Sequence, residues 1–310
     1  MDDSACLISL IRDSLRPMLP LPPPPLPPAL EALVYRPGKS GRNPFAGVRG
    51  VLFDVYGTLF SSAAGDIETG NNAGTGDRGS PPENSTNRET PDTPFPGIGE
   101  AIVLGELKAY FRSAVREIRE KLTARTAWPE VRAEEIWAAF IRERGLAVNP
   151  RELALRYELA VNPVYPMPGA LEILKTLRAA GLSLGIISNA QFYTPFLFAA
   201  FFGALPEALG FEPRLLFYSY ELREAKPSPR LFAKALDQLT ALGIRSGDCL
   251  YVGNDMLNDI HPAAALGFQT LLFAGDGRSL RLRQGNPLVQ DLRPTGVIRS
   301  LADLKALWDR

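Results

Sequence analysis

The sequence predicts an α/β fold: a parallel β-sheet carries helices on both faces, and a small all-helical domain is inserted after the first strand. Two observations favour this fold. Over residues 168–308, short apolar runs alternate with helical patterns, which is typical of a parallel sheet. Residues 98–161, in contrast, show helical patterns only. A chain of 310 residues is long enough for such a core and a second, smaller unit.

The composition favours a small-molecule partner. Lys+Arg and Asp+Glu both number 34, so the net charge is zero, and we expect no nucleic-acid and no membrane partner. The two cysteines, Cys6 and Cys249, lie far apart and show no metal or disulfide spacing. The start of the chain is acidic and lacks a signal-peptide pattern, so a cytoplasmic location is expected. The oligomeric state stays open.

Residues 1–46 are predicted to form an N-terminal helix and a Pro-rich linker. The stretch 17–28 contains four consecutive prolines, Pro22 to Pro25, which favour an extended polyproline II conformation. We interpret it as a semi-rigid connector that ties the N-terminal helix to the body of the protein. A docking site for a Pro-binding domain is the alternative.

The first core strand ends at Asp54. The apolar run Val51-Leu52-Phe53 predicts a strand buried on both faces, and Gly57 suits a sharp turn after it. The predicted core comprises residues 47–61 and 166–310. Residues 62–97 are rich in Gly, Asn, Ser and Pro, which predicts a flexible low-complexity insertion, either a lid or a surface loop.

Three helices are predicted between residues 98 and 165. The first carries an apolar stripe from Ile102 to Leu122, the second follows Pro129, and the third begins after Asn149, a suitable N-cap. Helices and strands then alternate to the end of the chain. The predicted elements are helix 168–180, strand 183–187, helix 191–202, strand 215–218, helix 228–242, strand 250–252, helix 257–266, strand 270–273 and helix 301–308.

Polar side chains follow several of these strands. The carboxyl ends of parallel strands meet at one edge of a sheet, so we expect these side chains to lie close together. Carboxylates, a hydroxyl and a fixed cation can together attack and stabilise an anionic small-molecule substrate. The residues are Asp54, Ser188, Asn189, Lys226, Asn254, Asp255 and Asp259.

In order and spread, four stretches resemble the motifs of the haloacid dehalogenase-like hydrolase superfamily. The resemblance covers residues 48–275. It implies a Rossmann-like core, a helical cap at residues 98–165, an aspartate nucleophile that forms a covalent intermediate, and usually Mg²⁺. The stretches are Asp54-Val55-Tyr56-Gly57-Thr58, Ser188-Asn189, Lys226-Pro227 and the run from Gly253 to Asp259.

The resemblance also implies roles for single residues. Asp54 would be the nucleophile and Lys226 would offset the charge around it. Thr58 or Ser188 would hydrogen-bond the substrate anion. Asn189, Tyr56 and Gly57 complete the predicted substrate site, and the predicted metal ligands are Asp54, the carbonyl of Tyr56, Asp255, Asp259 and Asn254. Asn254 and Asp255 compete for one ligand position; Asp255 is favoured because only a carboxylate adds charge for a cation.

One position departs from the phosphatases of the superfamily. They usually carry a second Asp two residues after the nucleophile, where this chain has Tyr56. The first motif is therefore similar to that of the 2-haloacid dehalogenases, whereas the fourth resembles Mg²⁺-dependent phosphatases. The favoured function is Mg²⁺-dependent hydrolysis of a small phosphorylated metabolite. The alternatives are a metal-free 2-haloacid dehalogenase and a catalytically degenerate binding protein.

Overall fold

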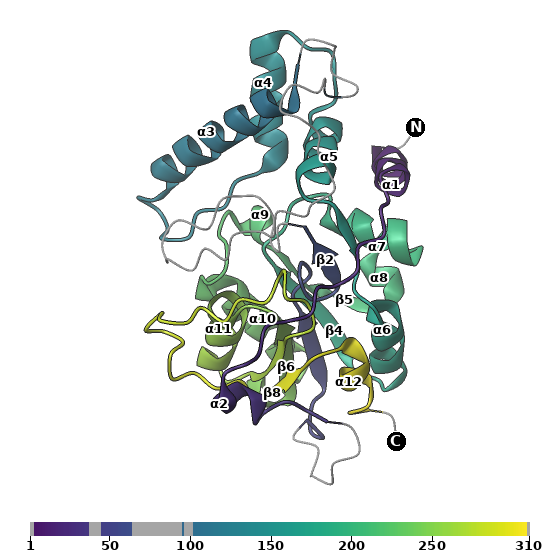
Figure 1. Cartoon of the computed structure of the whole chain (residues 1–310), viewed down its shortest axis with the longest axis vertical. Helices are drawn as coiled ribbons and strands as arrows, with labels where there is room; N and C mark the ends of the chain where they lie inside the picture. The colour runs from purple at the N-terminus through teal and green to yellow at the C-terminus, as the bar shows by residue number, and fades with distance from the viewer. Residues whose placement is uncertain (1–2, 37–44, 64–94, 96–101, 309–310) are drawn as a thin grey trace.

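A six-stranded parallel sheet forms the centre of the protein, in the order β5-β4-β1-β6-β7-β8. The computed structural model describes residues 3–36, 45–63, 95 and 102–308. Helices cover both faces of the sheet (Figure 1), which confirms the predicted α/β, Rossmann-like fold. The strands are β1 (Gly50–Phe53), β4 (Ser183–Ser188), β5 (Phe211–Tyr218), β6 (Cys249–Gly253), β7 (Gln269–Phe273) and β8 (Gly296–Ile298).

The order of the strands sets the position of the site. The first strand of the sheet, β1, lies in its middle. The next two, β4 and β5, lie on one side of β1, and β6 follows on the other side. In open α/β sheets, ligands bind outside the carboxyl ends of the strands where the order reverses. The carboxyl ends of β4, β1 and β6 are neighbours at this point.

The strands direct alternate side chains into two apolar layers, as the pleat requires. Val51 and Phe53 pack with α6, α7 and α12 on one face, whereas Leu52 packs with α10 and α11 on the other. Both layers are therefore covered. These helices are α6 (Ala170–Ala179), α7 (Thr194–Phe202), α10 (Pro229–Ala241), α11 (His261–Ala265) and α12 (Leu301–Lys305).

The three predicted helices of the insert are present and form the upper part of the molecule in Figure 1. Trp137 is fully buried among them, with its ring centroid 5.6 Å from that of Phe111 and 4.8 Å from that of Tyr157. The insert lies in sequence between two short antiparallel strands. The elements are β2 (Phe60–Ser62), α3 (Leu104–Leu122), α4 (Ala133–Arg144), α5 (Pro150–Val161) and β3 (Val164–Pro166). The predicted low-complexity insertion at 62–97 lies almost entirely outside the described residues.

The N-terminal segment runs along the core. Helix α1 (Asp3–Asp13) packs against α7 and α5. The Pro-rich stretch then crosses the molecule to α2 (Pro28–Glu31), as the purple trace in Figure 1 shows. Leu21 is fixed on the way, because its N–H donates to Asp276 at 2.9 Å. Val34 finally forms a parallel bridge with Val297 of β8.

Some elements differ from the sequence expectation. The predicted strand 215–218 begins earlier, at Phe211, and the predicted helix 257–266 is divided into a π-helical turn and α11. The strands β2, β3 and β8 were not predicted. The remaining short elements are α8 (Pro206–Leu209), α9 (Ser219–Leu222), the 3-10 turn η1 (Ser246–Asp248) and the π turn η2 (Met256–Ile260). Among the helices that the structure describes, none is long and apolar enough to cross a membrane.

Candidate active site

The turn after β1 carries Asp54 and Thr58. It lies at the edge of the sheet formed by the carboxyl ends of β4, β1 and β6, which we call the rim. Gly57 lies in this turn with φ +84°, a conformation that glycine adopts without strain. A Cβ atom on Gly57 would lie 2.6 Å from the Cβ of Ser279 and 2.7 Å from Nδ2 of Asn254. Both the conformation and the space therefore require glycine, and the turn can pass directly against the end of β6.

Two side chains from neighbouring segments converge on Asp54. Oγ of Ser188, at the end of β4, and Nζ of Lys226 both donate to Oδ1 of Asp54 at 2.8 Å. Asn189 places the lysine, because its Oδ1 accepts the main-chain N–H of Lys226 at 2.7 Å. All four residues are buried. The structure thus brings the predicted nucleophile, hydroxyl and cation together.

Lys226 also contacts Asp259, with Nζ 2.6 Å from Oδ1. Burial alone would lower the pKa of Lys226, but the carboxylates of Asp259 and Asp54 outweigh it and raise the pKa above its ordinary value. Burial has the opposite consequence for Asp259: it raises the pKa of this carboxyl to about 7, although Lys226 acts to lower it. The lysine therefore stays protonated and supports the charged form of both acids.

Asp259 holds the turn after β6 in place. Its Oδ2 accepts the main-chain N–H groups of Asn254 and Asp255, both at 3.0 Å. The hydroxyl of Tyr251 lies 3.1 Å from Oδ1 and donates to the carbonyl of Ile187 at 2.8 Å. Burial and the charge of Asp259 raise the pKa of this phenol well above 10. Sequence reasoning missed Tyr251; the signal was a hydroxyl within the apolar run of β6.

Asn254 and Asp255 point to different partners. Oδ1 of Asn254 accepts from Oγ1 of Thr58 at 3.1 Å, and its Nδ2 donates to the carbonyl of Ser279 at 2.6 Å. The amide oxygen of Asn254 therefore faces the turn that carries Asp54. The carboxylate of Asp255, the ligand favoured at this position, contacts other groups, and the choice between the two residues stays a prediction.

Asp255 caps the π turn η2 and pairs with Arg283. Its Oδ1 accepts the N–H groups of Leu257 and Asn258 at 2.8 and 3.2 Å. The guanidinium of Arg283 donates to both carboxylate oxygens, with Nη2 2.6 Å from Oδ2. Sequence reasoning missed Arg283, and no local signal could have found it because 28 residues separate it from Asp255.

The side chain of Tyr56 turns towards helix α7. Its hydroxyl lies 2.9 Å from Oγ1 of Thr194, and both groups are buried. The neighbouring phenol of Tyr193 has a raised pKa because it is buried and because it lies close to Glu158 and Tyr56. The position that carries a carboxylic acid in related phosphatases thus holds a phenol that is already engaged in a hydrogen bond.

The donor atoms at the rim suit Mg²⁺. Hard cations take carboxylate, amide and main-chain carbonyl oxygens, which Asp54, Asn254 and Tyr56 supply. With every ionisable group charged, three carboxylates and two cations leave one negative charge; these groups are Asp54, Asp255, Asp259, Lys226 and Arg283. Within the described part of the chain, no three His, Cys, Asp or Glu side chains gather as a metal cluster.

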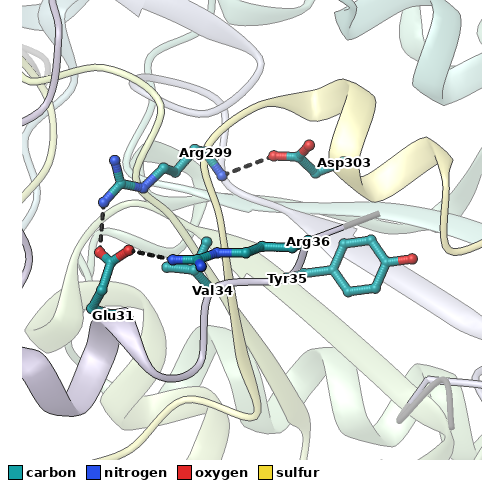
Figure 2. A pocket seen from close by; sticks show the side chains of 6 residues that line it. All are labelled: Glu31, Val34, Tyr35, Arg36, Arg299 and Asp303. Atoms are coloured by element: carbon teal, nitrogen blue, oxygen red, sulfur yellow. Dashed lines mark hydrogen bonds and ion pairs between the residues drawn. The ribbon is translucent and has the colours of Figure 1, made fainter. Parts of the chain in front are cut away.

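A separate cavity of about 300 Å³ lies at the edge of the sheet beside β8. Figure 2 shows the carboxylate of Glu31 between the guanidinium groups of Arg36 and Arg299, at 2.9 and 2.6 Å. Residues from the N-terminal segment and from the last part of the chain line this cavity, and none of the predicted site residues is among them. Its lining consists of Glu31, Val34, Tyr35, Arg36, Arg299 and Asp303.

Known proteins resemble the chain in sequence and fold. A phosphoglycolate phosphatase of Xylella fastidiosa (strain 9a5c) is 29% identical over 243 residues, which is 77% of this chain and 85% of that protein. The rhythmically expressed gene 2 protein of Drosophila melanogaster is 29% identical over 111 residues, or 34% of this chain and 40% of that protein. The structure of the L-2-haloacid dehalogenase PA0810 has a TM-score of 0.50 at 17% identity. It covers 83% of this chain and 97% of its own, and this likeness shows the fold.

The sequence profile of one hydrolase family matches most of the chain. It describes the haloacid dehalogenase-like hydrolases and covers residues 48–267. This span begins just before β1 and includes the four stretches that meet at the rim. The chain therefore belongs to the haloacid dehalogenase-like hydrolases.

Proposed function

We propose that this hydrolase cleaves a small phosphorylated metabolite with the help of Mg²⁺, through a covalent intermediate on Asp54. One observation carries the proposal: Ser188 and Lys226 both donate to the same oxygen of a buried Asp54 at 2.8 Å. A carboxylate held in this way is oriented for attack, and the ammonium lies where a phosphate would gather negative charge. The relative named phosphoglycolate phosphatase makes phosphoglycolate the first substrate to test.

The reaction takes two displacement steps at phosphorus. A carboxylate oxygen of Asp54 forms a bond to phosphorus, while the bond to the leaving oxygen breaks and that oxygen keeps the electron pair. Water then attacks the phosphorus of the acyl phosphate, and the bond between phosphorus and the Asp54 oxygen breaks. Inorganic phosphate leaves, the proton of the water passes to solvent, and the carboxylate of Asp54 is restored. Lys226 offsets the charge in both steps. When bound, Mg²⁺ would neutralise phosphate charge, held by Asp54, the carbonyl of Tyr56 and the amide oxygen of Asn254.

The hydroxyl of Tyr56 limits the choice of substrate. A phenol is a weaker acid than a carboxylic acid, and this one is bonded to Thr194. An alkoxide leaving group needs a proton, whereas a nitrophenolate or a carboxylate leaves without one. We therefore expect p-nitrophenyl phosphate and acetyl phosphate to be hydrolysed faster than alkyl phosphates, phosphoglycolate among them.

Dehalogenation at carbon is the second candidate. Tyr56 replaces the carboxylic acid, and the amide of Asn254 rather than the carboxylate of Asp255 faces the turn that carries Asp54. Both features suit a reaction in which Asp54 displaces halide from carbon to form an ester, which water then hydrolyses. Halide needs no proton to leave, and the scheme needs no metal. Chloride release from 2-chloropropionate without added cation would favour it.

The test is the substitution Asp54→Asn, with Asp237→Asn on the surface of α10 as the matched control. We expect Asp54→Asn to reduce turnover of acetyl phosphate and phosphoglycolate about a thousandfold or more, because the nucleophile is lost. The control should keep wild-type rates, and Mg²⁺ should stimulate them. Full activity in Asp54→Asn would refute both hydrolytic schemes. Wild-type protein that turns over neither phosphate nor halide substrates would favour the degenerate binding protein.

A further inference from the structure

We propose that Arg283 sets how tightly the site binds its cation: it is an internal counter-ion that keeps Asp255 out of the Mg²⁺ coordination shell. The inference rests on the proposed Mg²⁺-dependent function. It explains how a chain with an aspartate in the fourth motif presents the neutral amide of Asn254 to Thr58, in the turn that carries the nucleophile. It also predicts that this enzyme binds Mg²⁺ more weakly than it would without Arg283.

The contacts of Asp255 leave little room for a metal ion. Arg283 donates from Nε to both oxygens at 3.1 and 3.2 Å, and from Nη2 to Oδ2 at 2.6 Å. Two main-chain N–H groups of the π turn also donate hydrogen bonds to Oδ1 of Asp255. The side chains of Asp255 and Arg283 are only 8% and 15% exposed. A partly buried, bidentate pair of this kind is among the stronger ionic hydrogen bonds, so a cation would have to displace it.

The loop that carries Arg283 is fixed against the fourth motif. The main chain of Arg281 accepts from the N–H of Met256 at 2.9 Å and donates to the carbonyl of Asn254 at 3.0 Å. Arg283 itself has φ +54°, which is uncommon for a residue with a side chain. The backbone thus holds the guanidinium at Asp255, and such a conformation persists only where its surroundings support it.

Removal of the guanidinium changes the charge at the rim. Arg283→Gln would raise the net negative charge of the five ionisable groups from one to two and would free the oxygens of Asp255. A second carboxylate close to the site attracts a divalent cation more strongly. We expect the dissociation constant for Mg²⁺ and for Mn²⁺ to fall about tenfold or more.

Isothermal titration of the full-length protein with MgCl₂ and MnCl₂ tests this directly, without turnover. The variants are Arg283→Gln, Asp255→Asn and the double variant. Arg283→Gln should bind at least tenfold more tightly than wild type, and the double variant should return to within about threefold of it. Asp255→Asn alone removes one negative charge while Arg283 keeps its positive charge, so this variant should bind the cations about tenfold more weakly than wild type. Arg245→Gln is the matched control, since Arg245 makes a bidentate pair with Asp248 on the surface.

Two outcomes would overturn the inference. One is unchanged or weaker cation binding in Arg283→Gln; the other is loss of binding in the double variant, whose charge at the rim equals that of wild type, which would make Asp255 a ligand. If Arg283→Gln does not fold, as judged by circular dichroism, Arg283→Lys replaces it. This variant keeps the charge but breaks the bidentate pair, and its affinity should rise by a smaller factor. Mg²⁺-stimulated turnover with unchanged affinity in these variants refutes only the inference; no cation binding and no phosphate release in any variant refutes the proposed function as well.

Discussion

Lys226 lies between two buried carboxylates, 2.8 Å from Asp54 and 2.6 Å from Asp259. Its side chain is 3% exposed, so water does little to screen these charges. Removing one partner of a buried ion pair leaves an uncompensated charge, which is more damaging than the loss of a surface pair. The stability of the rim and its chemistry therefore depend on the same ammonium group.

The substitution Lys226→Met should lower the free energy of unfolding at pH 7.5 by about 3–5 kcal/mol. Methionine fills a similar volume, so the loss of stability measures the effect of removing the positive charge rather than the effect of a cavity. Urea denaturation measures it, with Lys234→Met on the exposed side of α10 as the control. A loss below about 1 kcal/mol, the range of surface pairs, would show that the carboxylates do not need the lysine.

The pH dependence of this loss has a definite sign. In wild type, the pKa of Lys226 is raised, so its contribution is complete below pH 10.5 and is lost only at higher pH. In Lys226→Met, burial still raises the pKa of Asp259 above its ordinary 3.8. The variant should therefore be most stable near pH 4 and lose stability as pH rises. The pKa of Asp259 is raised in wild type as well, to about 7, so both proteins lose stability as pH rises towards 7. The difference between them should grow only above about pH 7 in the same urea experiment; a constant difference from about pH 7 to pH 9 would contradict it.

At the residue scale, the sequence was most informative where a polar group directly ends a strand. Asp54 and Ser188 end β1 and β4, and both were expected at the rim, where the structure places them. The choice between Asn254 and Asp255 could not be made from sequence. On our proposal it depends on Arg283, which follows a segment that pairs with the fourth motif only in three dimensions.

At the element scale, helix α5 shows how a local signal fixes a boundary. Asn149 accepts the N–H of Arg151 at 2.8 Å and that of Glu152 at 3.3 Å, and Pro150 occupies the first helical position. This is the arrangement that the sequence predicted. Because the cap satisfies N–H groups that have no partner within the helix, its loss should cost stability without altering the core.

We expect Asn149→Ala to lower the free energy of unfolding by about 1 kcal/mol. Asn149→Ser retains a capping oxygen and should recover most of the loss. Chemical denaturation followed by circular dichroism at 222 nm measures both variants. Equal stability of the alanine and serine variants would show that the hydrogen bonds at this helix start contribute nothing.

Short strands that are held only by pairing with residues distant in sequence were not predicted. Strand β8 has three residues and is paired by β7 on one side and bridged by Val34 on the other. Strands β2 and β3 pair across the whole helical insert. The β2–β3 pairing and the bridge from Val34 to Val297 join residues more than a hundred apart in sequence, and a three-residue strand has too little pattern to reveal its partners. The longer buried strands and amphipathic helices were predictable because burial itself shapes their sequence.

At the scale of the whole molecule, α1 connects parts that are distant in sequence. The guanidinium of Arg12 donates to the carbonyls of Ala199 and Ala200 at the end of α7. At the other end of the helix, Asp3 pairs with Arg151 of α5 at 2.8 Å. Helix α1 thus contacts a core helix and a helix of the insert at the same time, and the Pro-rich segment carries the chain from there along the core.

Leu7 and Ile11 anchor α1, with exposed fractions of 0% and 1%. The substitution Leu7→Ala should therefore lower the free energy of unfolding by about 2–5 kcal/mol, because it removes buried methyl groups and leaves a cavity. Leu15→Ala is the control: this leucine is 39% exposed, and its loss should change stability by about 0.5 kcal/mol at most. Both follow from urea denaturation of the full chain. If α1 were a detachable tail, Leu7→Ala would unfold like the control, and the helix would have no part in holding the insert against the core.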